Sequence, residues 1–244
     1  IMPTVGEQKL IPGRACHPDE GCRSRDSHST EHASAGYYEV ELEDYKIKAQ
    51  LTATPRVGIH KYTYPSSDGR IVLDLNHGIY NYDGKVLWSY LRVENDTLLT
   101  GYRITNGWAR TNYTYFAISF SQPIKDYGYV DKKKPVYTGF WRRFKMDRNF
   151  PEIGGRAVVS YFNFDTSSNK ELVVKVALSA VSTEEALKNL LAEAGGKSFE
   201  QVVAEASEAW NEKLELFEIE GTEDQKAMFY TSLYHTMINP SVYM

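Results

Sequence analysis

Alternation of apolar and polar residues dominates the middle of this chain. The pattern begins at Tyr37 and recurs, broken only by turn residues, until Ser182. A period of two is the spacing of a β-strand that buries one face and leaves the other in water. The segments that follow it are 38–42, 47–53, 57–64, 70–76, 85–94, 97–106, 113–122, 135–141, 155–164 and 171–181. Their number and spacing predict a mainly β fold, a large antiparallel β-sandwich.

The breaks between these segments carry turn residues. Residues 65–69 combine Pro, Ser, Asp and Gly, while 82–85 and 95–96 suit tight hairpin connections. Residues 126–134 end in three consecutive lysines and are expected to form an exposed hairpin tip. Residues 1–36 are polar and rich in Gly, Pro, Ser and charge, so we expect an extended loop with little regular structure there.

Composition narrows the classes of partner. Aromatic residues make up 13% of the 244 residues, with 18 Tyr and 4 Trp, which suits half-buried strands. The tryptophans could stack on sugars, but packing in a core or an interface is their commoner role. They are Trp88, Trp108, Trp141 and Trp210. A net charge of −4 argues against nucleic acid. The apolar runs are too short to span a bilayer, which takes about 18 residues.

At Ser182 the period changes from two to that of a helix. Thr183 is a candidate N-cap, and the tandem glycines at 195–196 are expected to end the helix. A second helix is predicted at about 198–216. The first helix is expected to bury Ala186, Leu187, Leu190 and Leu191, and the second Phe199, Val202, Val203, Ala206, Trp210 and Leu214.

A third helix begins after residue 221. Thr222 with Gln225 three residues later forms a capping-box pattern. This helix carries a wide apolar stripe made of Met228, Phe229, Leu233, Met237 and Ile238, with Tyr230 and Tyr234 beside it. A stripe so wide needs more than one packing partner. The predicted organisation is a β-sandwich at 1–181, a helical linker at 182–221, and the first helix of a further domain at 222–244.

The two cysteines lie near the N-terminal end. Cys16 and Cys22 could form a disulfide across a short loop or remain two thiols. With His28 and His32 they could also hold zinc, and the final His-x3-His spacing fits such a site. Only five residues separate Cys22 from His28, however, where a zinc finger needs about a dozen. The spacing therefore favours the disulfide or the thiols.

Several separated strings resemble glycoside hydrolase family 92, the calcium-dependent exo-α-mannosidases. Residues 27–38 are similar to the family element Ser-His-x-x-Glu-x-Ala-x-Pro-Gly-Tyr-Tyr, with Ala35 where that pattern has proline. Residues 49–62 resemble its Glu-Leu-Thr-Ala-Thr-x-Arg-x-Gly-x-His-Arg-Tyr strand pair, with Gln50 and Lys61 as departures. Residues 176–182 and the closing helix complete a resemblance that extends over the whole chain.

The resemblance implies a fold and an activity for a longer protein. The family joins a mutarotase-like β-supersandwich through helices to an (α/α)6 barrel. It removes terminal α-linked mannose from N-glycans or mannans with inversion, using two carboxyl groups and calcium. Both carboxyl groups and the calcium ligands are expected beyond Met244, so we assign no catalytic and no metal-binding residue here. The chain is expected to be truncated at both ends, with an inactive fragment of an α-mannosidase as the result.

Four side chains are candidates for contact with sugar. His28 and Glu31 lie in the most motif-like loop, although a hydrogen bond that pins the loop is the simpler interpretation. His235 and Tyr243 lie on the helix that leads to the family's pocket, where packing is equally expected. His60, in an alternating strand, is expected to be a hydrogen-bonded sheet histidine rather than a ligand.

Three functional hypotheses follow. The first is the N-terminal portion of an exported α-mannosidase, periplasmic or extracellular, that supports its own catalytic barrel and borders the cleft for a mannose-containing glycan. The second is an autonomous carbohydrate-binding sandwich. The third is a structural module that contributes only an interdomain interface. Nucleic acid is not an expected partner of any of them.

Overall fold

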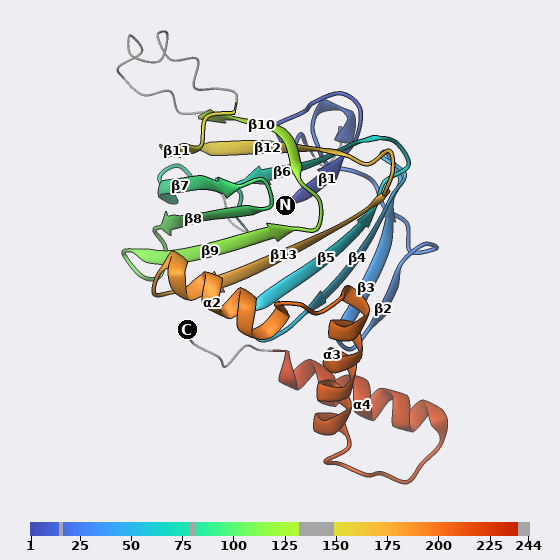
Figure 1. Ribbon diagram of the computed structural model, residues 1–244. Helices are drawn as coiled ribbons and strands as arrows, with labels where there is room; N and C mark the ends of the chain where they lie inside the picture. Colours follow the sequence, from blue (N-terminus) through green and yellow to red (C-terminus); the bar gives the residue numbers. More distant parts are fainter. Residues whose placement is uncertain (15–16, 79–81, 132–148, 239–244) are drawn as a thin grey trace.

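The chain folds into two antiparallel β-sheets and a helical layer (Figure 1). The computed structural model describes residues 1–244 except 15–16, 79–81, 132–148 and 239–244. A four-stranded sheet has the order β1-β6-β12-β10, and a nine-stranded sheet has the order β11-β7-β8-β9-β13-β5-β4-β3-β2. The prediction of a mainly β, two-sheet antiparallel fold is confirmed.

The element bounds follow the alternating segments closely. The strands are β1 (Met2–Thr4), β2 (His32–Ser34), β3 (Tyr37–Leu42), β4 (Ile47–Ala53), β5 (Val57–Thr63), β6 (Asp68–Asp74), β7 (Val86–Asn95), β8 (Leu98–Thr105), β9 (Asn112–Phe120), β10 (Ile124–Asp131), β11 (Glu152–Gly155), β12 (Val158–Asp165) and β13 (Glu171–Ser179). The helices are a 3-10 turn η1 (Pro18–Glu20), α2 (Thr183–Ala194), α3 (Phe199–Leu214) and α4 (Glu223–Met237).

The main core lies between the two sheets. Because successive side chains of a strand point to opposite faces, every second residue of the central strands enters this layer. On the nine-stranded sheet these include Tyr62, Leu99 and Val174, and on the four-stranded sheet Ile71 and Phe162 face them. All five are at most 2% exposed.

The central strands of the large sheet are apolar on their other face as well. Val57, Ile59, Ala117 and Ala177 point outward, away from the four-stranded sheet. Helix α2 lies across β13, β9 and β5 and covers them (Figure 1). It contributes Ala186, Leu190 and Ala194, each at most 4% exposed. The sandwich therefore has a second, smaller core on the helix side of the large sheet.

Hydrogen bonds hold α2 in register on the sheet. The Glu193 carboxylate accepts from the Arg56 backbone N–H at 2.9 Å, from the Arg56 guanidinium at 2.7 Å and from the Thr54 hydroxyl. At the end of the helix, Lys175 Nζ donates to the carbonyl oxygens of Ala194 and Lys197, both at 2.7 Å. The helix thus has a charged clamp on the β4–β5 turn and a second one on β13.

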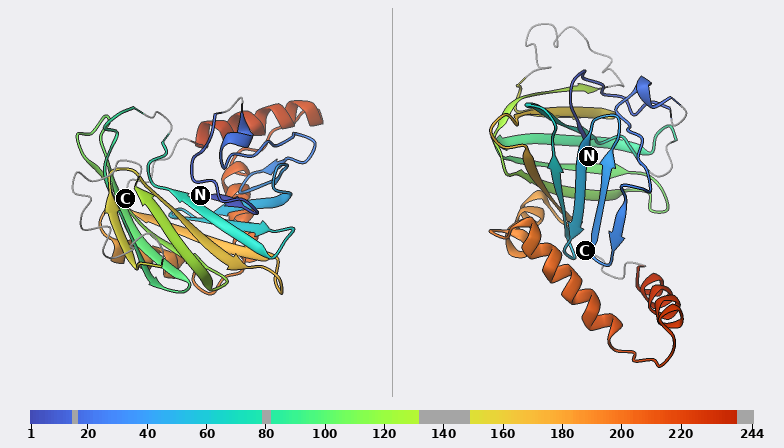
Figure 2. Two further views of the ribbon diagram at one scale, coloured as in Figure 1. Left: turned by 90° about the horizontal axis from the view of Figure 1, so that it is seen from above. Right: turned by 90° about the vertical axis from the view of Figure 1, so that its right-hand side faces the viewer.

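Helices α3 and α4 project from one end of the sandwich (Figure 2). The base of α3 is fixed, because Ser198 and Gln201 form a capping box and Phe199 and Val202 are buried. Thr222 and Gln225 form the predicted capping box of α4. None of the residues of α4 is buried, and its closest ring contact is between Tyr234 and Trp210, with centroids 4.7 Å apart.

Some strand predictions were wrong. Residues 126–131 of the expected exposed hairpin tip belong to β10, an edge strand. This strand buries Tyr129 against the main core. The expected loop at 1–36 contains β1, paired with β6, and β2, paired with β3. These strands carry their alternation over too few residues to be distinguished from loops. The predicted strand at 135–141 lies outside the described residues.

Two predictions about the helices were also wrong. Ser182, and not Thr183, is the N-cap of α2, because its hydroxyl accepts from the Glu185 backbone N–H. Leu191, expected to be buried, is 62% exposed, and of the stripe expected to be buried on α3 only Phe199 and Val202 are buried. A helix that lies on one flat sheet buries only the narrow side that touches it. The apolar stripes seen in the sequence are wider than the surface available to bury them.

We expect Glu193→Ala to destabilise the sandwich by about 1–2 kcal/mol, because three hydrogen bonds to a carboxylate are lost at a partly buried site. Burial raises the pKa of Glu193, but hydrogen bonds from Thr54 and Arg56 outweigh it and the net shift is downward. The contribution should therefore be present above the unfolded pKa of a carboxyl and be lost as pH falls through the lowered folded value.

Chemical denaturation between pH 3 and 7 measures this effect. Glu208→Ala, at an exposed position of α3, is the matched control. A loss of stability in Glu193→Ala that does not shrink at low pH would contradict the ionic origin of the clamp.

We expect removal of residues 222–244 to leave the unfolding temperature of the sandwich nearly unchanged and to reduce self-association. The reason is that α4 buries none of its residues and exposes Met228 to solvent. Differential scanning calorimetry and analytical ultracentrifugation measure the two effects. If amide exchange in a monomer is as slow in α4 as in the strands, the boundary at 221 is wrong and α4 belongs to the sandwich.

Candidate functional site

The motif-like loop folds around the carboxylate of Glu31. A turn forms first, in which the Thr30 backbone N–H and hydroxyl both donate to the Ser27 carbonyl oxygen at 2.9 and 3.0 Å. Glu31 Oε2 then lies 2.5 Å from His28 Nδ1, and Glu31 Oε1 accepts from the Tyr38 hydroxyl at 2.7 Å. One carboxylate therefore joins the loop to β3.

The electrostatics of this cluster are those of a charged acceptor at the surface. The hydrogen bond from Tyr38, followed by that from His28, lowers the pKa of Glu31. The same bond to a carboxylate, with burial as a second cause, raises the pKa of Tyr38 to about 12. The His28 side chain is 97% exposed, so its other ring nitrogen faces solvent. The cluster can present an oriented imidazole to a neighbouring group.

The turn between β2 and β3 requires a glycine at position 36. Gly36 has φ +82°, and a Cβ there would lie 2.9 Å from Ala206 Cβ of α3. The Gly36 carbonyl oxygen accepts from Thr52 on β4 at 2.7 Å. The turn is thus held between β4 and α3, and a residue with a side chain at 36 would be forced against the helix. Ala35, the departure from the family pattern, leaves this arrangement intact.

Successive tyrosines attach the segment to two different layers. Tyr38 packs against the core between the sheets, while Tyr37 points to the helix side, where its ring lies 6.3 Å from that of Phe199. The Tyr37 hydroxyl accepts from Gln50 Nε2 at 2.7 Å and donates to Glu39 at 2.5 Å. Gln50, another departure from the family pattern, is therefore an ordered part of the segment's support.

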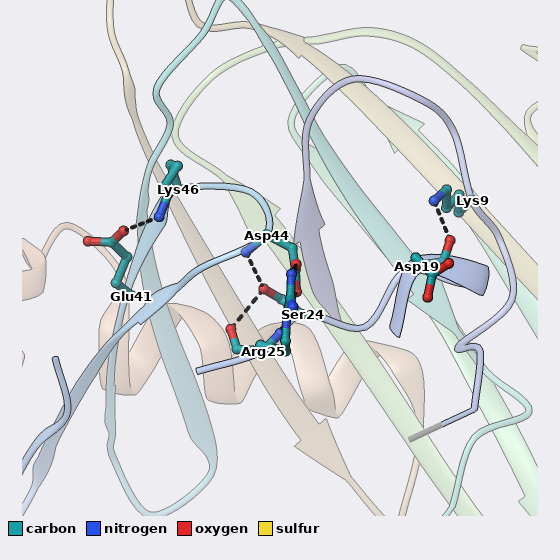
Figure 3. Close-up of polar contacts among 7 residues, drawn as sticks. All are labelled: Lys9, Asp19, Ser24, Arg25, Glu41, Asp44 and Lys46. Atoms are coloured by element: carbon teal, nitrogen blue, oxygen red, sulfur yellow. Dashed lines mark hydrogen bonds and ion pairs between the residues drawn. The ribbon is translucent and has the colours of Figure 1, made fainter. Parts of the chain in front are cut away.

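The chain just before the loop is fixed to the β3–β4 turn. Asp44 Oδ2 accepts from the Arg25 backbone N–H at 2.6 Å, and Asp44 Oδ1 pairs with the Arg25 guanidinium. The Asp44 backbone N–H donates to the Ser24 hydroxyl at 3.1 Å (Figure 3). The side-chain bonds from Arg25 are the main cause of the lowered pKa of Asp44. These contacts place His28 and Glu31 at a defined edge of the large sheet.

His235 lies in a groove that the same segment helps to form. The groove has a volume of about 360 Å³ and is lined by Ala33, Ser34, Ala35, Leu214, Tyr230, Thr231, Tyr234 and His235. His235 and Thr231, four residues apart on α4, both line it. His28 and Glu31 are not among the lining residues. The structure therefore brings His28 to Glu31 and His235 to Ala35, in two neighbouring arrangements.

The remaining predicted candidates have different outcomes. Tyr243 and Trp141 lie outside the described residues. His60 is a hydrogen-bonded sheet histidine, as predicted: its Nδ1 lies 2.7 Å from the Tyr62 hydroxyl, and burial lowers its pKa to about 4. Of the tryptophans expected in a core or an interface, Trp88 is 40% exposed and Trp108 is fully exposed, so neither lies in the core.

The described part of the chain contains no cluster of side chains that supports a zinc or a calcium site. Cys22 is buried beside Val72 and Val159, whereas the His28 side chain is exposed. Cys16 lies outside the described residues. Among the residues that are described, no three His, Cys, Asp or Glu side chains are grouped so that they could hold a metal ion. Calcium sites usually include carboxylates, and that part of the chain shows no group of three such side chains.

Two supporting residues could not be identified from sequence as partners of the loop. Tyr38 is seven residues from Glu31, and Ala206 is far along the chain from Gly36. A Tyr at the start of an alternating strand signals only packing, and a helical alanine signals only a close approach.

The described helices include none that combines the length and apolar character of a membrane span.

We expect Glu31→Gln to increase amide exchange in residues 27–36 about three- to tenfold, because the charged acceptor for Tyr38 and His28 is lost. His28→Ala should have a smaller effect, since its ring is already in solvent. In the wild type, ordering of the loop should be present above the usual pKa of a carboxyl and be lost as pH falls through the lowered pKa of Glu31.

Exchange followed by NMR or mass spectrometry at several pH values measures this. Glu41→Gln is the control. It removes a carboxylate of β3 that pairs with Lys46 in the β3–β4 turn and not with the loop (Figure 3). Equal exchange in Glu31→Gln and the wild type would show that the loop is ordered by its backbone alone.

The whole chain superposes on solved structures of known relatives. It is 36% identical to the family GH92 α-mannosidase BT3965 of Bacteroides thetaiotaomicron, with a TM-score of 0.88 over 100% of this chain and 31% of that one. It is 26% identical to the family GH92 inverting mannosidase BT2199 of the same organism, with a TM-score of 0.79 over 98% of this chain and 29% of that one.

A curated relative has the same sequence identity to this chain as BT2199. The chain is 26% identical to a protein described as an uncharacterized secreted glycosidase of Arthroderma benhamiae, over 99% of this chain and 34% of that protein. The chain thus spans about a third of the length of the relatives it matches.

Two family models match the chain in succession. Residues 1–179 match the N-terminal domain of glycosyl hydrolase family 92, which corresponds to the two sheets. Residues 185–244 match the catalytic domain of the same family, which corresponds to the three helices at the C-terminal end. The sequence motifs, the fold and both matches agree, and the chain belongs to glycosyl hydrolase family 92.

Proposed function

We propose that this chain is the non-catalytic N-terminal portion of an exo-acting α-mannosidase. The observation that carries the proposal is the overlap with α-mannosidase BT3965, whose structure this chain follows along its entire length while covering 31% of it. The enzyme would remove α-linked mannose from the non-reducing end of N-glycans or mannans. Its localisation would be periplasmic or extracellular, for which the description of the fungal relative as secreted is support.

The division of labour in the proposed enzyme follows the predicted boundaries. Residues 1–181 would form the supporting sandwich, 182–221 the linker and 222–244 the first helix of an (α/α)6 catalytic barrel. The exposed positions on α4, such as Met228 and the 51% exposed Ile238, would be buried by neighbouring barrel helices. The clamps on α2 would then transmit the orientation of the sheet to the barrel.

The edge of the sheet that carries residues 27–38 would border the substrate cleft. Its support is the groove that His235 lines together with Ala33 and Ala35, and the exposed imidazole of His28 in the same segment. In this proposal Glu31 orients His28, and His28 or His235 contacts a hydroxyl of the sugar. Tyr243, which follows α4 in the sequence, would be a further candidate for contact with the sugar.

The reaction chemistry would come from the remainder of the enzyme. An inverting glycosidase needs one carboxylic acid to protonate the leaving group and one carboxylate to activate water, about 6.5–9.5 Å apart. We propose that both, and the ligands of the calcium ion, lie in the barrel. Inversion is supported by the description of BT2199 as an inverting mannosidase.

A second candidate function is an autonomous carbohydrate-binding or structural sandwich. The main observation in its favour is that both cores of residues 1–202 are closed without any contribution from α4. A module of this kind would bind its partner at full affinity without the barrel.

The proposed function predicts that this chain alone releases no mannose from α-mannosides, with or without calcium. The physical reason is that, in this proposal, the pair of carboxyl groups that inversion requires and the calcium ligands lie in the remainder of the barrel. Release of mannose from yeast mannan and from aryl α-mannosides, followed over days, measures this.

An active family member assayed in parallel controls for substrate and calcium quality. Calcium-dependent turnover that copurifies with the chain through two orthogonal columns would overturn the assignment of catalysis to the remainder of the enzyme.

A further inference from the structure

A set of aromatic side chains gathers on the part of the large sheet that α2 does not cover. The set, called the aromatic ladder, consists of Trp88, Tyr90, Tyr102, Tyr113 and Tyr115. It extends over β7, β8 and β9, which lie side by side at one end of the nine-stranded sheet (Figure 1). All five share the face of Ala117, the face on which α2 packs further along β9.

The strand register places three of these rings in one row. Tyr90 pairs with Tyr102, and Tyr102 pairs with Tyr115. The centroids of the first two rings are 5.5 Å apart and those of the second two 5.7 Å apart. Tyr113 continues from Tyr115 along β9, with a centroid distance of 6.1 Å and an angle of 13° between the rings. The rings therefore form one continuous surface and not isolated contacts.

A second row lies at the end of the strands. Trp88 pairs with Ile104, and Ile104 pairs with Tyr113. Trp88 is 40% and Tyr113 44% exposed, so large parts of both rings face solvent. The indole packs on Gly154 of β11, where a Cβ would come within 2.9 Å of its Cζ2 atom. Glycine at position 154 of β11 thus leaves space for the indole, and a side chain at that position would fill the space.

The opposite side of the row of tyrosines is polar. Arg92 lies between two carboxylates, 3.3 Å from Glu94 and 3.9 Å from Glu152. The Tyr90 hydroxyl donates to Glu152 at 2.5 Å, and the Thr100 hydroxyl donates to Glu94 at 2.6 Å. The ladder is therefore bordered by planar groups that can donate and accept hydrogen bonds.

We propose that the aromatic ladder is a binding surface for a neutral oligosaccharide chain. A pyranose ring has an apolar face of C–H groups and an edge of hydroxyl groups. The positively polarised C–H groups suit the negative face of an aromatic ring, and Tyr and Trp offer large rigid surfaces for such contacts. The hydroxyl edge suits the row of Arg92, Glu94 and Glu152, which would fix its orientation.

Other occupants fit this chemistry less well. A nucleic acid needs an excess of basic side chains, whereas Arg92 is outnumbered by Glu94 and Glu152. A lipid surface also calls for an excess of basic residues beside the rings, which the row of Arg92, Glu94 and Glu152 does not provide. A second copy of the chain is the occupant that sedimentation tests below. A mannan is the probe of choice, and this choice, unlike the ladder itself, rests on the proposed function.

Affinity electrophoresis of the purified chain through gels that contain yeast mannan tests the proposal. We expect the wild type to be retarded, and the double variant Trp88→Ala/Tyr113→Ala to lose affinity on the order of tenfold or more. Phe217→Ala is the matched control, because Phe217 is an aromatic residue 50% exposed in the α3–α4 connection. It should be retarded like the wild type. Unchanged circular dichroism and unfolding temperature establish that the double variant is folded.

Several outcomes would overturn the proposal. They are equal retardation of the double variant and the wild type, and absence of retardation of the wild type by both mannan and laminarin. Retardation of the wild type by laminarin but not by mannan would support the binding surface and reject mannan as its ligand. Sedimentation that shows a dimer in the wild type and a monomer in the double variant, without mannan binding, would assign the ladder to self-association. None of these results affects the proposed function, which rests on family membership and is tested by mannose release.

Discussion

The fold depends on the fact that the central strands of the large sheet are apolar on both faces. A sandwich with one buried face per sheet needs no helices, but Val57, Ile59 and Ala177 point away from the other sheet. Left in water, they would form a continuous apolar patch. Helix α2 removes that patch, and burial of Leu190 alone contributes about 2 kcal/mol. Helix α2 is therefore packed into the sandwich and does not project from it.

The covered face also determines where the loop of residues 27–38 lies. Because α2 ends at Gly195 and α3 starts at Phe199, the corner between them is short and is held by Lys175. Phe199 then meets Tyr37, and Ala206 closes over Gly36. The orientation of the exposed His28 is thus linked, through one hairpin turn, to the packing of the helices on the sheet.

The sequence predicted the parts of the structure that repeat over many residues. Nine of the described strands follow from alternation alone, and the capping box at Thr222 and Gln225 was visible because it is local. The strand β10 and the exposure of Leu191 were missed, since both depend on which surface lies opposite. For the same reason the His28–Glu31 pair was predictable from its spacing, whereas its partner Tyr38 required the register of β3.

The outer face of the large sheet carries small residues where α2 covers it and large aromatic residues where α2 does not. Where α2 lies, the sheet has small residues such as Ala117 and Ala177, which allow close approach of the helix. On the part of β9 that α2 does not cover, large aromatic residues take their place, and Tyr115, only two residues before Ala117, is part of the aromatic ladder. Tyrosine can remain partly exposed because its hydroxyl is solvated while its ring covers the sheet. The change from alanine to tyrosine along β9 therefore marks where α2 stops covering the sheet and where the proposed binding surface begins.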